Sequence, residues 1–209
     1  MKIAIFGATG GTGSQLVERG LAEHEIIAVA RRPEAITAKH DRLRVVKGDV
    51  LDPASIAAAI AGADAVISAI GPANNKEPGT LISDGVANLV AACTKAGIAR
   101  FVFESGLMVG DARGLSPFGK LGVAIYRAMN KKLCADKRIA EATIQASTLD
   151  WVIVRPPALD HSPARGGYKH GVDIRLNPAK KLSHADAADF LLRVAGDGAL
   201  ARTVQDVGF

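Results

Sequence analysis

The first residues in this chain whose spacing could do chemistry are glycines. The stretch GATGGTG places Gly7, Gly10 and Gly13 at the spacing G-x-x-G-x-x-G, between an apolar run and a helical pattern. Glycine permits a sharp turn at the first position, lets the backbone approach a pyrophosphate at the second and allows close helix packing at the third. The helix start adds free N–H groups and a positive dipole end for phosphate. The pattern predicts a dinucleotide-binding turn, and a purely structural turn is the alternative.

The context of this turn strengthens the prediction, because glycine-rich turns are common by themselves. The turn follows a predicted strand at Lys2–Phe6 and leads into a predicted helix at Gly13–Leu21, which is the order that a dinucleotide site requires. Within the turn, Thr9 and Thr12 offer hydroxyl donors and Gly11 a further backbone N–H. We therefore include these three residues in the predicted phosphate site.

The residues after the second strand indicate which dinucleotide is bound. An acidic side chain there would accept hydrogen bonds from the adenosine ribose, but the stretch IIAVARRPE offers Arg31 and Arg32 and no acid before Glu34. Two guanidinium groups favour a 2′-phosphate through charge and forked hydrogen bonds. The sequence predicts NADP(H) in preference to NAD(H), with Arg31 the stronger candidate. The alternative is that one or both arginines are simply solvated.

Composition sets limits on the class of protein. The chain has 209 residues, of which 48% are hydrophobic and 22% charged, as expected for one globular domain spanning residues 1–209. The net charge of +5 is too small and dispersed to predict nucleic-acid binding. No run of 18 apolar residues occurs, so we expect no membrane span. We expect a monomer or a small homo-oligomer.

The cysteines and histidines predict no metal site and no disulfide framework. Cys93 and Cys134 lie in predicted helices without metal-type spacing. His161, His170 and His184 share no ligand spacing with cysteine or acidic residues. Because two cysteines are too few for a disulfide scaffold, and because no signal-peptide pattern opens the chain, we expect a reduced, cytoplasmic setting.

Short apolar runs alternate with helical patterns through the chain, which predicts an α/β fold. The fold class is a doubly wound, mainly parallel Rossmann-type sheet in a single domain. We predict strands at Lys2–Phe6, Ile26–Ala30, Arg44–Lys47, Ala65–Ala69, Arg100–Phe103, Trp151–Val154 and near Arg202–Val207. We predict helices at Gly13–Leu21, Pro33–Lys39, Pro53–Ala61, Thr80–Ala96, about Pro117 to Gln145, and about His184–Val194.

Three loops interrupt this alternation, at about 71–79, 106–116 and 159–181, and the last carries one predicted short strand around Val172–Arg175. Ligands of open parallel sheets bind beyond the carboxyl ends of the strands, so these loops are expected on the substrate side. Basic residues of these regions are candidate contacts for an anionic acceptor, with a solvated surface as the alternative: Arg113, Lys120, Arg165, Lys169, His170, Arg175, Lys180 and Lys181.

Taken together, several stretches resemble the atypical short-chain dehydrogenases, in the small NAD(P)H-binding branch of NmrA-like proteins and biliverdin-IXβ/flavin reductases. They are KIAIFGATGGTG, ARRPE, VVKGDVLDPASI, ADAVISAIG, GVANLVAACTKAGIARFVFESG, STLDWVIVRPPAL and LSHADAADFLL. The resemblance implies further cofactor-binding residues at the ends of successive strands: Asp49, Val50, Ala69, Ile70, Gly71, Ser105, Pro156, Ala158 and Leu159. Asp49 has an alternative role as a turn residue, and Pro156 could simply end a strand. Ser183 and Asp186 are interpreted as a helix cap and its partner.

The resemblance also shows what is missing. Better-known short-chain enzymes use a Tyr-x-x-x-Lys pair, and here Lys137 matches the lysine while Leu133 stands where the tyrosine would be. Tyr126 is five residues from Lys131, which turns the two away from a shared helical face. Ser105 and Lys137 remain as candidate catalytic residues. Lys137 is also a candidate for binding the cofactor ribose, or a plain i,i+4 partner of Glu141.

Without a tyrosine acid, chemistry that charges one localised oxygen is disfavoured. Hydride transfer to a planar conjugated acceptor such as a flavin or quinone leaves a delocalised anion that solvent can protonate, so positioning suffices. The sequence therefore predicts an NADPH-dependent oxidoreductase for such an acceptor. A histidine that flavin/biliverdin reductase carries after the sixth strand is Ala158 here, which weakens the tetrapyrrole case. The alternative is a non-catalytic NADP(H)-binding redox sensor of the NmrA-like type.

Overall fold

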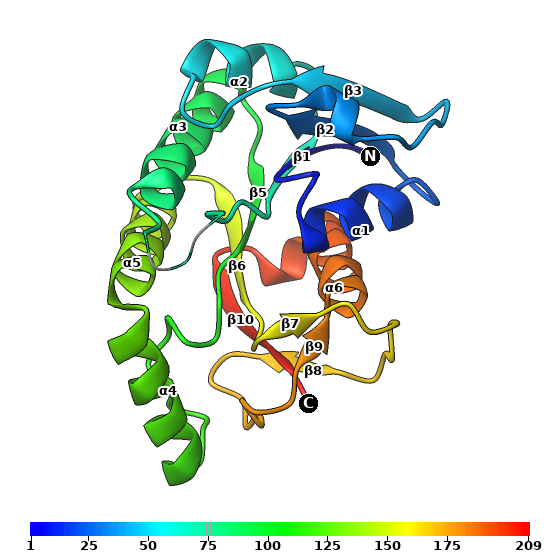
Figure 1. Cartoon of the computed structure of the whole chain (residues 1–209). Coiled ribbons are helices and arrows are strands. Elements are labelled where there is room, and N and C mark those ends of the chain that lie inside the picture. The colour runs from blue at the N-terminus through cyan, green and yellow to red at the C-terminus, as the bar shows by residue number, and fades with distance from the viewer. Residues whose placement is uncertain (74, 76) are drawn as a thin grey trace.

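The apolar strands of this chain are buried on both faces. In the first strand, β1 (Lys2–Phe6), side chains of Ile3 and Ile5 pack on one face and those of Ala4 and Phe6 on the other, all at most 1% exposed. Because successive side chains of a strand point to opposite faces, both faces need a covering layer. The computed structural model, which describes residues 1–73, 75 and 77–209, provides helices on both (Figure 1).

The described residues form one eight-stranded sheet in the order β3-β2-β1-β4-β5-β6-β10-β8, in which β8 alone runs antiparallel to its neighbour. Besides β1, its strands are β2 (Glu25–Ala30), β3 (Leu43–Lys47), β4 (Ala65–Ser68), β5 (Arg100–Glu104), β6 (Asp150–Arg155), β8 (Lys169–Gly171) and β10 (Thr203–Gly208). A small parallel pair joins β7 (Leu159–Asp160) and β9 (Leu182–Ser183). The fold class predicted from the sequence is confirmed.

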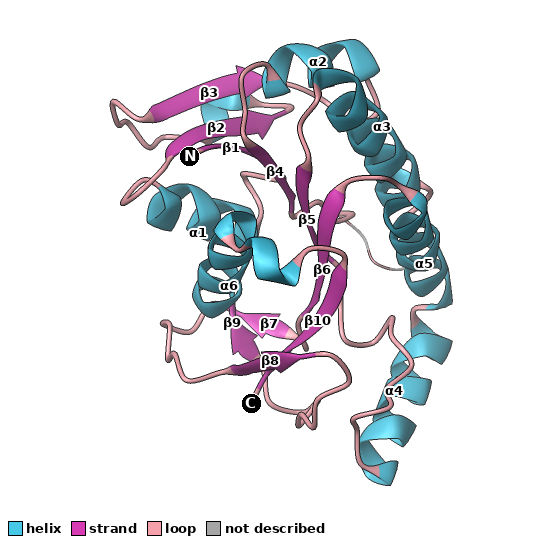
Figure 2. Cartoon of the chain, turned by 180° about the vertical axis from the view of Figure 1, so that it is seen from behind, coloured by secondary structure: helices cyan, strands magenta, loops and turns pink. Residues whose placement is uncertain are grey.

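Two groups of helices cover the sheet. The helices of the described chain are α1 (Gly11–Gly20), α2 (Pro53–Ile60), α3 (Leu81–Ala96), α4 (Pro117–Met129), α5 (Lys131–Ala146) and α6 (His184–Gly196). Helices α1 and α6 pack together on one face, and α2, α3 and α5 pack on the other (Figure 2). Helix α4 extends away from the sheet beyond α5.

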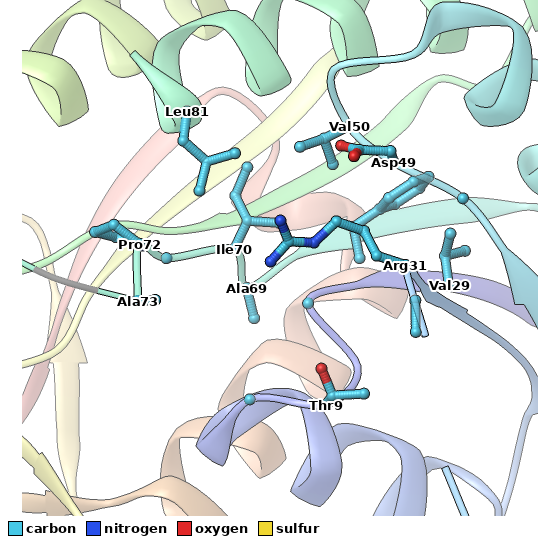
Figure 3. Close-up of a pocket in the computed structure, with 16 residues that line it drawn as sticks. Thr9, Val29, Arg31, Asp49, Val50, Ala69, Ile70, Pro72, Ala73 and Leu81 are labelled. Carbon is cyan, nitrogen blue, oxygen red and sulfur yellow. The ribbon is translucent and has the colours of Figure 1, made fainter. Parts of the chain in front are cut away.

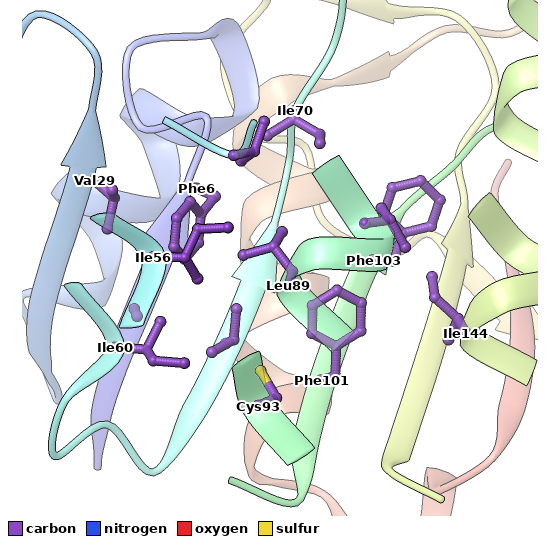
Figure 4. Packing of buried hydrophobic residues seen from close by; sticks show 14 of the residues in the cluster. Phe6, Val29, Ile56, Ile60, Ile70, Leu89, Cys93, Phe101, Phe103 and Ile144 are labelled. Atoms are coloured by element: carbon purple, nitrogen blue, oxygen red, sulfur yellow. The ribbon is translucent and has the colours of Figure 1, made fainter. Parts of the chain in front are cut away.

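Each helix layer encloses its own hydrophobic core. Under α2, α3 and α5 lie Phe101 and Phe103 of β5 with Leu89 of α3, all fully buried (Figure 4). Under α1 and α6, Phe190 and Leu16 pack against the opposite face of the strands. Each such side chain stabilises the fold by about 1.5–3 kcal/mol relative to exposure, so both layers contribute to holding the helices on the sheet.

Local signals explain where several helices begin and end. The Asp52 carboxylate accepts the N–H of Ala54 at 3.1 Å ahead of Pro53, the first residue of α2. Helix α3 ends at Ala96 and is capped by Gly97, whose φ of 71° suits glycine. The interpretation of Ser183 and Asp186 as a cap is confirmed, because Ser183 Oγ accepts the Asp186 N–H at 2.9 Å and donates to its carboxylate at 2.7 Å.

Three predicted elements differ from the structure. The helix predicted at Pro33–Lys39 is one 3₁₀ turn at Pro33–Ala35, after which Ile36 is extended. The long helix predicted from Pro117 is two helices, because Asn130 leaves helical geometry and its side-chain amide donates to the carbonyl of Tyr126.

The third difference lies in the loop 159–181. The short strand predicted around Val172–Arg175 instead occupies Lys169–Gly171, where it pairs with the end of β10. Asp173, at a φ of 50°, belongs to the turn that follows the strand. Residues 74 and 76 of the predicted loop 71–79 lie outside the described residues.

The strand order reverses between β1 and β4, and this reversal positions the ligand site. β2 and β3 extend the sheet to one side of β1, while β4, β5 and β6 extend it to the other. Crossover helices therefore leave the carboxyl ends of β1 and β4 in opposite directions, which opens a crevice beside them. None of the described helices is both long enough and apolar enough to cross a bilayer.

Burial of Asp206 makes the stability of this fold pH-dependent. Asp206 lies on β10, is 9% exposed, and pairs in register with Arg155 of β6. Burial raises the pKa of Asp206 to about 6, although the Arg155 charge opposes the rise. The folded chain therefore holds this proton more tightly than the unfolded chain. The associated stability is complete below about pH 4 and is lost as the pH rises through about 6.

We expect Asp206→Asn to stabilise the protein by about 2–3 kcal/mol at pH 8, and to leave it unchanged near pH 4. Thermal unfolding of both proteins across this range measures the effect, which corresponds to about 5–10 °C at pH 8. Asp41→Asn, at an exposed position, is the matched control. Equal melting temperatures of wild type and Asp206→Asn at pH 8 would contradict the assignment.

Candidate functional site

The glycine turn after β1 is held against the backbone of the neighbouring strand. Gly7 has a φ of 84°, and a Cβ atom there would lie 2.4 Å from the carbonyl oxygen of Ala69. The Gly10 N–H donates to the Gly7 carbonyl at 2.9 Å, and a Cβ on Gly13 would lie 1.9 Å from the same oxygen. Backbone therefore fills the space that side chains would need at Gly7 and Gly13.

Gly10 differs from these two glycines because it is exposed and less crowded. A Cβ there would meet a single neighbour, the Gly7 carbonyl, at 3.3 Å. Gly10 caps α1 without any side-chain hydrogen bond, and the first turn of α1 carries no acidic residue. The first N–H groups and the positive dipole end of α1 are thus left for an anion. The turn fits the pyrophosphate of a dinucleotide.

A cavity of about 350 Å³ opens on one side of this turn. Arg31, an exposed residue just beyond β2, extends into it toward the side where Val50 and Ile70 lie (Figure 3). We call it the adenosine-side cavity. Its walls are Phe6, Gly7, Thr9, Gly10, Val29, Ala30, Arg31, Gly48, Asp49, Val50, Ala69, Ile70, Gly71, Pro72, Ala73 and Leu81.

Asp49 has the hydrogen bonds of a turn residue and also lies in the cavity wall. It lines the adenosine-side cavity and is half-buried. Its carboxylate also accepts the N–H of Leu51 at 3.0 Å, and its own N–H donates to Ser55 Oγ at 3.0 Å. These bonds fix the turn after β3 and hold the Asp49 side chain at the cavity wall.

A second cavity, of about 620 Å³, continues from the first on the other side of Gly10. The two share Gly10, Ala69, Ile70, Gly71 and Pro72, so they form one cleft along the carboxyl ends of the strands. We call the second one the acceptor-side cavity. Its other walls are Gly11, Thr12, Asn75, Glu104, Ser105, Gly106, Met108, Val109, Tyr126, Leu133, Cys134, Lys137, Pro156, Pro157, Ala158, Leu159 and His184.

Ser105 presents an unsatisfied hydroxyl in this wall. Its backbone N–H donates to Val154 at 2.7 Å, and its carbonyl accepts from Lys137 Nζ at 2.6 Å. Its Oγ atom is buried and has no hydrogen-bond partner among the described residues. Because a buried hydroxyl without a partner is costly, this atom fits a polar group of a bound ligand.

Lys137 projects from α5 into a low-dielectric environment. Burial lowers the pKa of its ammonium group, and the nearby Glu104 carboxylate partly offsets this effect. The alternative of a Lys137–Glu141 pair is wrong, because Glu141 instead forms a two-bond ion pair with Arg155 at 3.0 and 2.5 Å. The lysine is thus aimed at the end of β5, toward the cavity.

Glu104 is a functional candidate that the sequence reasoning missed. It is 9% exposed at the end of β5, and Thr12 Oγ1 lies 2.8 Å from its Oε1 atom. Burial raises its pKa, and the Thr12 hydrogen bond and the Lys137 charge oppose the rise. Thr12 Oγ1 also lies 2.9 Å from Nδ1 of His184. The Thr12 hydroxyl is therefore directed at these two groups and not at the predicted phosphate.

Tyr126 also lines the acceptor-side cavity, on the helix before Lys137. Because the chain breaks at Asn130, α4 and α5 present Tyr126 and Lys137 to the same space, whereas Lys131 takes no part. The tyrosine is half-buried, and burial raises the pKa of its phenol above the usual range. Tyr126 thus lines the cavity without Lys131, and the spacing argument, which concerned only that pair, did not reveal this placement.

The structure brings almost all of the predicted site residues to one cleft. The exceptions are Gly13, which packs against Gly7 beneath the turn, and Arg32, which caps the 3₁₀ turn outside both cavities. Sequence reasoning missed Glu104 and His184, which lie 92 and 172 positions from Thr12. Contacts at such separations leave no local signal.

The basic loop residues proposed as acceptor contacts do not line either cavity. Arg165, for example, donates to the Lys181 carbonyl at 2.7 Å and lies over the Phe209 ring, and Arg113 pairs with Asp111. Among the described residues, no group of three or more His, Cys, Asp or Glu side chains is placed to hold a metal ion.

Comparison with known proteins agrees with a dinucleotide-binding cleft. Residues 7–197 match the model of a family described as NAD(P)H-binding. An uncharacterized chloroplastic protein of Arabidopsis thaliana is 30% identical over 79% of this chain, which spans 61% of that protein's length. An anaerobillin reductase from Escherichia coli O157:H7 is 27% identical, with a TM-score of 0.78 over 99% of this chain and 96% of its own.

The fold and the cleft define a Rossmann-type dinucleotide-binding protein, and the chain belongs to the NAD(P)H-binding family. The resemblance to atypical short-chain dehydrogenases is confirmed at the level of this family. A short-chain dehydrogenase/reductase of Veillonella parvula in complex with NADP shares the fold, with a TM-score of 0.79 at 21% identity over 100% of this chain and 94% of its own.

The crowding at Gly13 predicts a purely structural penalty. We expect Gly13→Ala to destabilise the protein by about 3 kcal/mol, since the added methyl group would overlap the Gly7 carbonyl. Gly122→Ala, in α4 with no atom within 4 Å of its Cβ position, is the matched control. It should stabilise by about 0.5–1 kcal/mol. Chemical denaturation measures both changes, and a neutral Gly13→Ala would contradict the packing described.

Proposed function

We propose that this protein is an NADPH-dependent oxidoreductase that transfers hydride to a planar conjugated acceptor, such as a flavin or a quinone. The observation that carries the proposal is the continuous cleft. Its adenosine-side cavity suits the adenosine half of a dinucleotide. Its larger acceptor-side cavity suits the nicotinamide and leaves room for an acceptor beside it. Family membership supports the nucleotide, and the reductase among its relatives supports the reaction class.

In this proposal the diphosphate binds at the start of α1 and the nicotinamide enters the acceptor-side cavity. The bound NADPH supplies the hydride. Ser105 Oγ hydrogen-bonds a polar group of the cofactor or acceptor, and Lys137 binds the adjacent ribose. Pro156, Ala158 and Leu159 provide an apolar part of the wall against which rings stack. The residues act chiefly by positioning the two rings.

The preference for NADPH rests on Arg31. Its guanidinium extends into the adenosine-side cavity, and the sequence has no acidic residue between the end of β2 and Glu34; the acid in the cavity wall is Asp49, after β3. A forked guanidinium is matched to the 2′-phosphate of NADPH in charge and in geometry.

The reaction is tested by mixing the purified protein with NADPH and a panel of FMN, riboflavin, quinones and biliverdin while nicotinamide absorbance is followed. We expect oxidation of NADPH that depends on one or more of these acceptors. NADPH binding without turnover across the panel would contradict the enzyme and favour the redox-sensor alternative. Unequal affinities for NADP⁺ and NADPH, measured by calorimetry, would then support a sensor, because a ligand shifts states only through differential affinity.

The role of Arg31 predicts a selective loss of affinity. Arg31→Ala should weaken NADPH binding about 10- to 100-fold, because one charged hydrogen-bonding partner of the 2′-phosphate is removed, and should leave NADH binding within about threefold. Calorimetric titration with both nucleotides measures this difference. Arg32→Ala, which lies outside both cavities, is the matched control and should change neither. An equal loss for both nucleotides would contradict the 2′-phosphate assignment.

A further inference from the structure

Three side chains from distant parts of the sequence form a hydrogen-bonded chain in the acceptor-side cavity. Thr12 Oγ1 at the start of α1 lies 2.8 Å from Oε1 of Glu104 and 2.9 Å from Nδ1 of His184. Glu104 and Thr12 are 9% and 4% exposed, whereas His184 is half-buried at the start of α6. All three line the cavity, so the hydrogen-bonded chain runs from a buried carboxyl group to a half-buried imidazole in the cavity wall.

A threonine hydroxyl has one proton to donate, which allows two arrangements of this chain. In the first, His184 Nδ1–H donates to Thr12, and Thr12 donates to an ionised Glu104. In the second, a protonated Glu104 donates to Thr12, and Thr12 donates to Nδ1 of His184. The two arrangements differ by the shift of two protons along bonds that are already formed. The geometry is that of a proton relay.

We propose that Glu104, Thr12 and His184 deliver the proton that the acceptor needs after hydride transfer. This inference rests on the proposed function, and it replaces the solvent proton that the absence of a Tyr-x-x-x-Lys pair suggested. His184 is the residue that touches the acceptor, while Thr12 and Glu104 act through it.

The step balances in atoms and electrons. As NADPH is oxidised to NADP⁺, the acceptor gains a hydride, and His184 gives its Nε2 proton to the resulting acceptor anion. Thr12 returns a proton to His184 Nδ1, and Glu104 returns one to Thr12. The relay thus ends with an ionised Glu104 and a neutral His184 protonated at Nδ1. A proton from solvent, entering through His184 Nε2, restores the starting arrangement.

The charges around the chain suit this direction of transfer. Glu104 is faced by Thr12 from α1 and by Lys137 from α5, and the lysine ammonium stabilises the carboxylate that forms. His184 is faced by Thr12, by the His161 ring with centroids 4.7 Å apart, and by Asp160. Burial raises the pKa of Glu104 and lowers that of His184, and the His161 charge lowers the latter further. Both shifts favour the arrangement in which the proton is on Glu104 over the one in which it is on His184.

The hydrogen-bonded chain of Glu104, Thr12 and His184 is tested in the ligand-free protein by ¹⁵N NMR of the His184 imidazole. Thr12→Val keeps the shape of the side chain without its hydroxyl, and Thr12→Ser keeps the hydroxyl. We expect Thr12→Val to change the tautomer ratio of His184 and to shift its titration by about half a pH unit or more, with Thr12→Ser restoring wild-type behaviour. Identical His184 resonances and titration in wild type and Thr12→Val would overturn the relay.

Its role in turnover is tested with the best acceptor of the panel. Thr12→Val and Glu104→Gln should each lower kcat on the order of 10²-fold and remove one ionisation from the pH profile, with NADPH affinity within about threefold of wild type. Thr12→Ser should restore turnover. Thr94→Val, at an exposed position in α3, is the matched control and should have no effect. Wild-type kcat and pH profile in both Thr12→Val and Glu104→Gln would overturn the proposal.

The NMR measurement and the turnover measurement together distinguish a failure of this inference from a failure of the proposed function. A wild-type protein that binds NADPH but reduces no acceptor would refute the proposed function, and the NMR measurement would still decide whether the chain is coupled. If the wild type turns over and Tyr126→Phe alone abolishes turnover, the tyrosine is the acid and the relay is refuted.

Discussion

The structure depends on one close backbone contact at the point where the strand order reverses. Gly7 lies against the carbonyl of Ala69, and Gly13 lies against the carbonyl of Gly7, at separations that exclude any side chain. This contact sets the height at which α1 leaves the sheet, and so aims its first N–H groups along the crevice. The same packing brings Thr12, one residue before Gly13, to the end of β5 and to His184 of α6. The glycine turn at the start of α1 and the hydrogen-bonded chain of Thr12, Glu104 and His184 thus both follow from this one backbone contact.

The buried polar groups of the cleft are organised around β5. Its last residue, Glu104, and the following Ser105 stand between α1 on one face and Lys137 of α5 on the other. The ion pair between Glu141 of α5 and Arg155 holds the carboxyl end of β6, and Lys137 has no carboxylate partner within ion-pair distance among the described residues. A lysine near a carboxyl of raised pKa, beside an unsatisfied hydroxyl, is an arrangement typical of functional sites.

The fold and the nucleotide half of the cleft could be predicted from the sequence, because their signals are local. The continuous apolar strands, the glycine spacing and Arg31 just beyond β2 are each defined within a short stretch of chain, whereas Arg32, predicted with Arg31, lies outside both cavities. The acceptor half could be predicted only in part. Ser105 and Lys137 followed from family resemblance, but Glu104 and His184 gain their meaning from Thr12, which lies far from both in sequence. The break at Asn130 could not be predicted either, because the hydrophobic periodicity continues through it. The position of Tyr126 in the cavity wall depends on that break, so it could not be predicted from the sequence.

The central claim is that the turn after β1 holds the diphosphate of NADP(H) while the nicotinamide lies beside Ser105. A crystal structure with NADPH bound tests this most directly. The account predicts diphosphate oxygens on the backbone N–H groups at the start of α1, the 2′-phosphate at Arg31, and the nicotinamide in the cavity that His184 lines. A nucleotide bound elsewhere, or a diphosphate away from the glycine turn, would contradict it.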